Sequence, residues 1–226
     1  KVRYRDSMVQ PFISLSNMKL EVLNTSGQKT GKTVSLDTEV FAIEPNDHAI
    51  YLDVKRYLAA QRTGTHKSKH RGEIHGSTRK LHKQKGTGGS RKGSIKNPLF
   101  RQGGTIFGPQ PRSYDIKVNK STQRLARKSA LSYKAQENSI VMLDAISMDK
   151  PHTQTFAGML KNLNLDSKKA LVLIPERNDA VFLSSRNLVK AQVQIASQVN
   201  TYDIMNSNMV VFVGNAHEMV TELLKK

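Results

Sequence analysis

The 226-residue chain carries 36 Lys and Arg against 18 Asp and Glu, a net charge of +18, with 37% hydrophobic residues and no cysteine. The missing cysteines exclude disulfides and thiolate metal sites, and no apolar run approaches the roughly 20 residues that span a bilayer. We therefore expect a folded cytoplasmic protein that has a polyanionic partner and no membrane partner.

The first regular pattern begins near Met18. Residues 1–17 precede it, and we set them apart as an N-terminal extension of undetermined status. Apolar and polar residues then alternate over Lys19–Leu23 and over residues 33–36, which predicts two short strands joined across Ser26-Gly27.

Two amphipathic helices are predicted on either side of a glycine-rich segment. Asn46-Asp47 can cap the first helix, whose apolar residues share one face: Ile50, Val54, Tyr57 and Leu58. Asn119 can cap the second, which reaches about Gln136.

Apolar strands and helical stretches alternate in the rest of the chain. The predicted strands are residues 140–143, 170–174, 193–195 and 209–213, and a last helix places Ala216, Met219, Val220, Leu223 and Leu224 on one stripe. Continuously apolar strands separated by amphipathic helices are typical of a parallel sheet covered on both faces. We predict a single Rossmann-like α/β domain with a mostly parallel sheet, formed by residues 18–61 and 113–226.

The segment between these parts, residues 62–112, differs sharply in composition. It holds 13 Lys and Arg, a single acid (Glu73) and 10 of the 14 glycines, hence a charge of +12. Its apolar residues are too sparse to offset the entropy of ordering it alone. Cations attract phosphates, and glycines let the main chain approach a packed surface closely. We predict a long extended loop that penetrates a folded RNA, whereas a solvated basic linker is the simpler alternative.

Several residue types in and after this loop suit RNA contact. Phe100, Phe107 and His82 can stack on unpaired bases. The helix after Asn119 adds a basic face of residues spaced at i, i+4, i+7 and i+8. The predicted RNA-binding residues are Arg62, Lys67, Lys69, Arg71, Arg79, Lys80, Lys83, Gln84, Lys85, Arg91, Lys92, Lys96, Arg101, Arg112, Lys120, Arg124, Arg127 and Lys128. The predicted close-approach glycines are Gly86, Gly88, Gly89, Gly93, Gly103 and Gly104.

No motif of the chain supports catalysis. Residues 27–33, GQKTGKT, have three residues between the glycines where a phosphate-binding loop has four, and they precede a strand rather than a helix. Four histidines lie in the loop (His66, His70, His75 and His82), without the carboxylates or thiols that complete a metal site. We therefore predict no enzyme, no cofactor and no metal.

The loop sequence closely resembles the bacterial large-subunit ribosomal protein four family. The resemblance rests on KQKGTG at 83–88, RKGSIKNPLFRQGG at 91–104 and FGPQPR at 107–112, and it extends from Met18 to the C-terminus. It implies a structural protein of the large ribosomal subunit that binds 23S rRNA, supports subunit assembly and works in the ribosome of the cytoplasm.

The resemblance also implies a place for the loop tip in the wall of the nascent-peptide exit tunnel. The tip would help form the tunnel constriction, opposite large-subunit protein twenty-two, where the nascent peptide passes. By alignment, the tunnel-lining residues are Thr78, Arg79, Lys80, Leu81, His82 and Lys83.

Two other functions stay open at this stage. One is a nucleotide-binding enzyme with a basic substrate loop, because parallel sheets host many activities. The other is a non-ribosomal RNA-binding chaperone.

Overall fold

The computed structural model describes residues 19–148 and 150–225, so the extension predicted at residues 1–17 lies outside the described residues. The chain divides into two compact units. One, here called the domain, is formed by the chain up to Tyr57 and from Lys117 onward. The other, here called the insert, is Leu58–Ile116, and it contains the predicted loop, residues 62–112.

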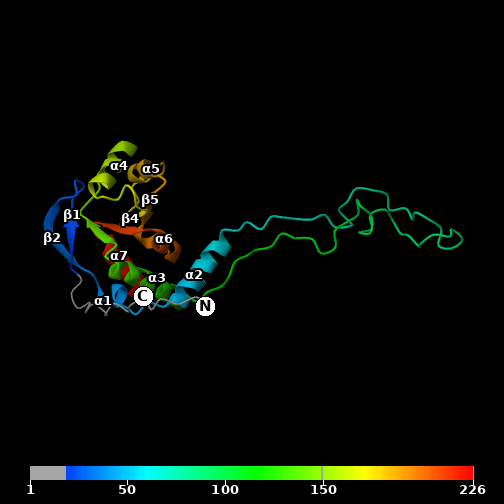
Figure 1. The fold of residues 1–226 in the computed structure, drawn as a ribbon, viewed down its shortest axis with the longest axis horizontal. Helices are drawn as coiled ribbons and strands as arrows, with labels where there is room; N and C mark the ends of the chain where they lie inside the picture. The colour runs from blue at the N-terminus through cyan, green and yellow to red at the C-terminus, as the bar shows by residue number, and fades with distance from the viewer. Residues whose placement is uncertain (1–18, 149, 226) are drawn as a thin grey trace, which may run out of the picture. The chain divides into compact units, whose positions relative to one another are not determined.

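The domain is built on a six-stranded sheet with the order β2-β1-β3-β6-β4-β5 (Figure 1). Its strands are β1 Lys19–Leu23, β2 Lys29–Ser35, β3 Ile140–Leu143, β4 Ala170–Ile174, β5 Ala191–Ile195 and β6 Met209–Val213. Only the β1–β2 pair is antiparallel; the four other pairings of these described strands are parallel. The predicted α/β class with a mostly parallel sheet is confirmed.

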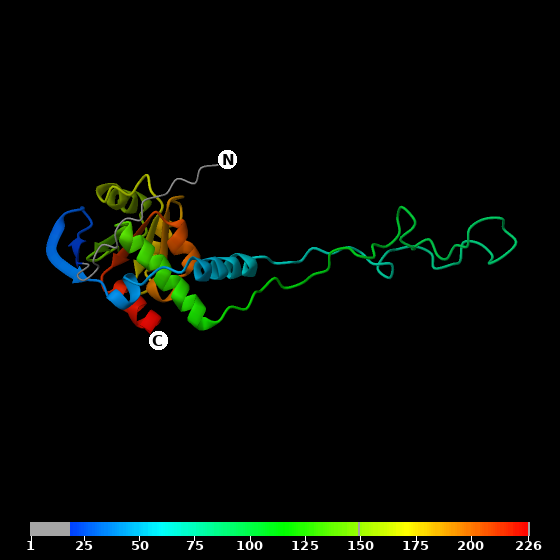
Figure 2. The ribbon, with the colours of Figure 1, turned by 60° about the horizontal axis from the view of Figure 1, so that its bottom comes forward.

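Helices cover both faces of this sheet (Figures 1 and 2). They are α1 Thr38–Phe41, α2 Asp47–Ala60, α3 Lys120–Gln136, α4 Thr153–Asn162, α5 Asp179–Ser185, α6 Thr201–Asn206 and α7 Ala216–Lys225. Leu171 and Leu173 of β4 pack in one buried cluster with α1, α3, α6 and α7, whereas Val172 packs in a second cluster with α4 and α5. Because side chains alternate along a strand, a continuously apolar strand supplies both clusters.

The first hairpin is longer than the sequence pattern indicated. β2 begins at Lys29 rather than at residue 33, because Lys29 already pairs with Leu23. Gly27 in the turn has a φ of +79°, and a Cβ there would lie 2.5 Å from the carbonyl oxygen of Asn162. The glycines of the near phosphate-loop motif therefore serve a hairpin, and the element that begins there is strand β2 rather than a helix.

Helix α2 begins as predicted, and its buried face matches the predicted stripe only in part: Ile50 is buried, and Val54 and Tyr57 are half-buried. The Asn46 side chain accepts a hydrogen bond from the Ala49 amide at 2.9 Å, which caps the helix. The buried residues are Ala49, Ile50 and Asp53, whereas Leu58, predicted on the apolar face, is exposed. The predicted apolar stripe did not include Asp53. Its carboxylate can be buried because it has polar partners.

The other predicted helices are present, with two differences. Asn119 occupies the cap position of α3 without a side-chain hydrogen bond. In α7 the buried residues are Ala216, Val220 and Leu224, and the predicted stripe residue Met219 is exposed.

Candidate nucleic-acid interface

The insert is a ribbon of two arms joined by backbone hydrogen bonds. Along residues 62–119, all of which the structure describes, there is no helix or strand. Four amide-to-carbonyl bonds nevertheless link the outgoing and returning arms: Arg112 to Gly64 at 3.2 Å, Ser68 to Pro109 at 2.9 Å, Thr105 to Lys69 at 3.0 Å and Leu81 to Gly93 at 3.1 Å. The insert is thus partly organised without belonging to a sheet.

Tyr114 organises the base of the ribbon. The Arg62 guanidinium lies 3.8 Å from the centre of its ring, and that of Arg112 lies 4.5 Å away. The hydrogen bond from Arg112, together with the charges of Arg112 and Arg62, lowers the pKa of the Tyr114 hydroxyl, which also lies 3.2 Å from Nε2 of His66. Gly64 has a φ of +64°, and a Cβ there would lie 2.1 Å from the Arg112 carbonyl oxygen. The base therefore requires glycine at this position.

The returning arm contains three successive turns. The amides of Asn97, Phe100 and Gly103 donate to the carbonyl oxygen three residues earlier, at distances of 3.2, 3.0 and 2.9 Å. A Cβ on Gly103 would lie 1.9 Å from the Asn97 carbonyl oxygen, and one on Gly104 would lie 2.3 Å from the backbone nitrogen of Arg71. These two predicted close-approach glycines are thus occupied by contacts inside the insert.

The other predicted close-approach glycines are open. A Cβ on Gly86, Gly88, Gly89 or Gly93 would meet nothing within 4 Å. The first two also have positive φ values, of +78° and +63°. Bare, exposed backbone on these residues gives a ligand direct access to peptide groups.

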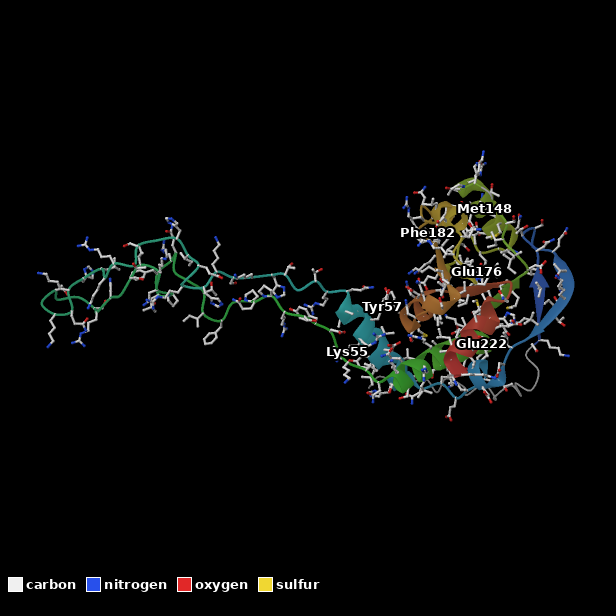
Figure 3. The ribbon with its side chains drawn as sticks, turned by 180° about the vertical axis from the view of Figure 1, so that it is seen from behind. Lys55, Tyr57, Met148, Glu176, Phe182 and Glu222 are labelled. Carbon is white, nitrogen blue, oxygen red and sulfur yellow. The ribbon has the colours of Figure 1, made fainter. Side chains whose placement is uncertain are left out.

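The apex of the ribbon is the segment beyond the Leu81–Gly93 hydrogen bond. Residues 75–93 are all exposed. The predicted tip residues Thr78, Arg79 and Lys80 precede the closing bond, whereas His82 and Lys83 lie beyond it. Four further residues of the predicted RNA-binding set also lie between residues 82 and 92: Gln84, Lys85, Arg91 and Lys92. Side chains tipped with nitrogen project from both arms (Figure 3).

The single acid of the insert is already neutralised. Glu73 pairs with Lys67 Nζ at 2.5 Å and accepts a hydrogen bond from the His70 amide at 3.2 Å. The bond from Lys67 is the main cause that lowers the pKa of the Glu73 carboxyl. Among the described ion pairs, this is the one that involves residues 62–112. The remaining cations of the segment are therefore available to an external anion.

Two apolar side chains of the insert are almost completely exposed. Phe107 is 99% exposed and Leu99 is 90% exposed. Phe100 is only half-buried and His82 is exposed. Exposed aromatic rings beside cations are what stacking on unpaired bases requires.

The predicted basic face of α3 is only partly a surface. Lys120 is exposed, whereas Arg124, Arg127 and Lys128 are half-buried. Burial lowers the pKa of Arg127. The nearby Asp53 carboxylate raises this pKa, whereas the positive charges of Arg56 and Arg124 lower it further. The Arg127 Nε atom is buried without a hydrogen-bond partner among the described residues.

The buried carboxylate of Asp53, near this basic face, was not predicted from the sequence. Asp53 accepts hydrogen bonds from Arg56 Nε at 2.9 Å and from the Thr201 hydroxyl at 2.5 Å. The i,i+3 spacing of Asp53 and Arg56 on a helix was the available signal. The Asp53 carboxylate thus bonds to Arg56 and acts on the charge of Arg127, which the charge of Arg124 also reaches.

Two histidines of the insert, His66 and His70, take part in local hydrogen bonds. Nδ1 of His70 lies 3.1 Å from the Thr105 carbonyl oxygen, and its Nε2 contacts the Gln110 amide. In the part of the chain that the structure describes, no three His, Cys, Asp or Glu residues are grouped to hold a metal ion. No helix among the same residues is long and apolar enough to cross a membrane.

Comparison with known proteins places these features in a family. A family model for the ribosomal protein L4/L1 family matches residues 34–223. The chain is 53% identical over 209 residues to a protein of Flavobacterium johnsoniae, and 51% identical over 208 residues to one of Parabacteroides distasonis. Both alignments cover 92% of this chain and 100% of the relative, and both relatives are named large ribosomal subunit protein uL4.

Proposed function

Because the chain belongs to the ribosomal protein L4/L1 family, as its loop sequence indicated, we propose that it is a structural constituent of the large ribosomal subunit that binds 23S rRNA. The family is structural, which confirms that the chain is not an enzyme. The interpretation as a nucleotide-using enzyme is therefore dropped. It follows from this proposal that the protein is located in the cytoplasm, as part of the ribosome.

The observation that carries the proposal is the apex of the insert. It combines exposed cations with glycines whose surroundings are open, and the only carboxylate of residues 62–112 is paired with Lys67. Such a surface neutralises phosphates on several sides while its backbone approaches them closely. An acidic protein would supply scattered carboxylates, whereas folded RNA supplies a dense array of phosphates together with bases for Phe107.

The partly formed ribbon suggests how the insert supports assembly. Hydrogen bonds between its arms and the turns near Gly103 and Gly104 fix part of the backbone before RNA is met. The open apex is left to be ordered by RNA. Ordering one segment on binding costs less than ordering the whole insert, which favours capture of a folded rRNA site.

We further propose that the tip residues lie in the wall of the nascent-peptide exit tunnel, opposite protein twenty-two of the large subunit. The support is that residues 78–83 border or enter the exposed apex and that the chain is about half identical to curated uL4 relatives. In this position the tip would face both rRNA and the passing peptide.

Removal of the apex tests the rRNA role. In the proposed variant, residues 82–92 are replaced by Asn-Gly, the two-residue connection that favours a tight hairpin turn. We expect the domain to keep its circular dichroism spectrum and melting temperature, while 23S rRNA binding weakens and large subunits assemble poorly. Unchanged affinity for 23S rRNA would contradict the proposal.

Two further measurements separate the finer statements. A photo-crosslinking residue at His82 should label 23S rRNA and a stalled nascent peptide, whereas the same residue at the exposed Glu222 of α7 should not label the peptide. The chaperone alternative predicts loss of the protein from large subunits in a high-salt sucrose gradient. A structural constituent stays with them.

A further inference from the structure

The two edges of the sheet differ in how well they are protected. Edge strand β2 carries Lys29 and Lys32, contains Gly31 at a φ of +77°, and is next to a register shift. Charges, glycines and irregular register are the usual protection of an edge against pairing with another chain. Edge strand β5 has the sequence AQVQI, with no charge and no proline. It is therefore an open edge.

The hydrogen-bond register shows which groups of β5 are unused. β5 pairs in parallel with β4, with Gln192 opposite Leu171, and the Lys190 carbonyl accepts from the Ala170 amide at 2.8 Å. Because residues of a parallel strand alternate in direction, Val193 and Ile195 turn their N–H and C=O groups away from β4. No other strand of the described chain lies beyond β5.

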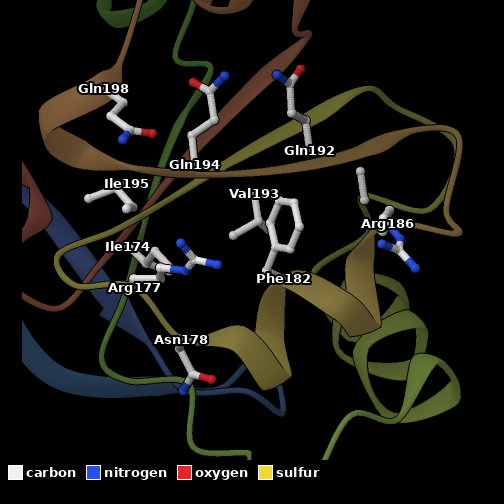
Figure 4. A pocket seen from close by; sticks show the side chains of 11 residues that line it. Ile174, Arg177, Asn178, Phe182, Arg186, Gln192, Val193, Gln194, Ile195 and Gln198 are labelled. Atoms are coloured by element: carbon white, nitrogen blue, oxygen red, sulfur yellow. The ribbon is translucent and has the colours of Figure 1, made fainter.

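A groove of about 550 Å³ runs along this edge (Figure 4). Its lining includes Gln192 and Gln194 from one face of β5 and Val193 and Ile195 from the other. Residues from both faces can line one groove only where that groove follows the strand edge. Phe182 of α5, which is 46% exposed, points toward Val193 and supplies an apolar wall.

The charges of the groove are positive. Arg177 and Arg186 line it, and no acidic residue does. Arg177 also pairs with Asp179 at 2.8 Å, but both side chains are well exposed and such a pair is weak. The Gln194 Oε1 atom is buried without a partner in the described chain, while its Nε2 donates to Asp203.

From these features we propose that the groove receives an extended acidic peptide segment of another protein, which pairs with Val193 and Ile195 and lengthens the sheet by one strand. Main-chain bonds to an open edge provide affinity in this mode, and side-chain pockets provide selectivity. One side chain of the peptide lies against Phe182, and a carboxylate meets Arg177 or Arg186. The proposal is separate from the RNA role of the insert.

The test uses the full-length chain labelled with nitrogen-15. The probe is the peptide acetyl-Thr-Val-Asp-Val-Thr-Val-Asp-Thr-amide, and its matched control replaces both Asp by Lys. We expect the acidic peptide to shift the Val193 and Ile195 amide signals and to slow their hydrogen exchange. The lysine analogue should bind about fivefold more weakly, because it forfeits two exposed ion pairs. In the double variant Arg177→Gln/Arg186→Gln, this preference should disappear.

A pair of substitutions at Ile195 isolates the backbone bond. Ile195 has a φ of −77°, which proline adopts, so Ile195→Pro removes the outward N–H with little strain. Ile195→Ala shortens the side chain and keeps the N–H. We expect the proline variant to bind the acidic peptide about tenfold more weakly than the alanine variant, at equal melting temperatures.

Four outcomes would overturn the proposal. The first is that the two Ile195 variants bind the acidic peptide equally well, and the second is that the β5 amide signals do not shift at up to roughly 1 mM acidic peptide. The third is that a uridine oligonucleotide, rather than the peptide, shifts these signals. The fourth is that the chain forms a concentration-dependent dimer that Ile195→Pro abolishes. The third would identify a nucleic-acid site. The fourth would identify pairing with a second copy of the chain.

Discussion

Four cations of the apex offer the sharpest test of how the insert binds RNA. Lys83, Lys85, Arg91 and Lys92 lie beyond the Leu81–Gly93 hydrogen bond, all are exposed, and none forms an ion pair within the described residues. Replacing all four by Gln removes charge and leaves every glycine in place. The backbone of the apex is therefore unchanged, and only the neutralisation of phosphates is lost.

The expected magnitude follows from the release of counterions. Each phosphate contact contributes about 0.7 to 0.9 to the slope of log K against log salt, so the quadruple variant should lower the slope by about 3. Between 50 and 200 mM salt, the affinity of the unaltered chain should consequently fall by a factor about 60 times larger than that of the variant. Fluorescence anisotropy with a 23S rRNA transcript at several salt concentrations measures both slopes.

A matched control carries the same change of net charge in the domain. It replaces by Gln four exposed lysines that form no ion pair among the described residues: Lys150, Lys161, Lys168 and Lys190. We expect its slope to stay within about one unit of that of the unaltered chain. Equal slopes for the two variants would refute the reasoning, because net charge and not the apex would then determine binding.

Three further predictions concern two glycines and three ion pairs. Gly104→Ala should weaken hydrogen-exchange protection of the insert, because its Cβ would lie 2.3 Å from the Arg71 nitrogen; Gly89→Ala, with open surroundings, should leave protection intact and weaken RNA binding instead. Asp53→Ala should lower the free energy of unfolding by about 3 kcal/mol in urea titrations, because it leaves half-buried arginines without their carboxylate. The exposed Asp179→Asn should change it by less than about 1 kcal/mol; equal effects would contradict the assigned role of burial. The hydrogen bond from Lys225 holds the pKa of Asp37 below its ordinary 3.8, so this stabilisation is complete above that pH and is lost as pH falls through the folded-state pKa. Melting temperatures below pH 3.8 should therefore fall less steeply for Asp37→Asn; identical profiles would contradict the pairing.

The fold was largely predictable because its central strands β3, β4 and β6 are wholly apolar. β4 supplies Leu171 and Leu173 to one buried cluster and Val172 to the other, and such double burial leaves a continuous apolar run in the sequence. The order of the strands was not predictable, since it depends on contacts between distant segments. The exposure of Leu58 was missed because periodicity does not show which part of a helix meets its neighbours.

The insert was predictable in character and not in detail. Charge and glycine content identified residues 62–112, and each RNA contact of its residues stays a prediction. The sequence does not distinguish Gly104, which a Cβ would force against Arg71, from Gly89, which has open surroundings. That distinction requires the pairing of the arms, which is a tertiary property. The groove beside β5 was not predicted from the sequence, because the order of the strands and the position of α5 beside this edge depend on contacts between distant segments.

The stack at the base of the insert has a geometric consequence for its two arginines. A guanidinium group contacts an aromatic ring through its flat face, and its N–H groups radiate from the rim. Arg62 and Arg112 can therefore stay over the Tyr114 ring while their N–H groups that do not bond to Tyr114 hold phosphate oxygens. The Tyr114 ring thus holds two positive charges close together and in a fixed orientation, without a carboxylate between them. Lysine keeps the positive charge but lacks a planar guanidinium group. Arg→Lys at either position therefore loses both the contact with the face of the Tyr114 ring and the bidentate hydrogen bonding to phosphate.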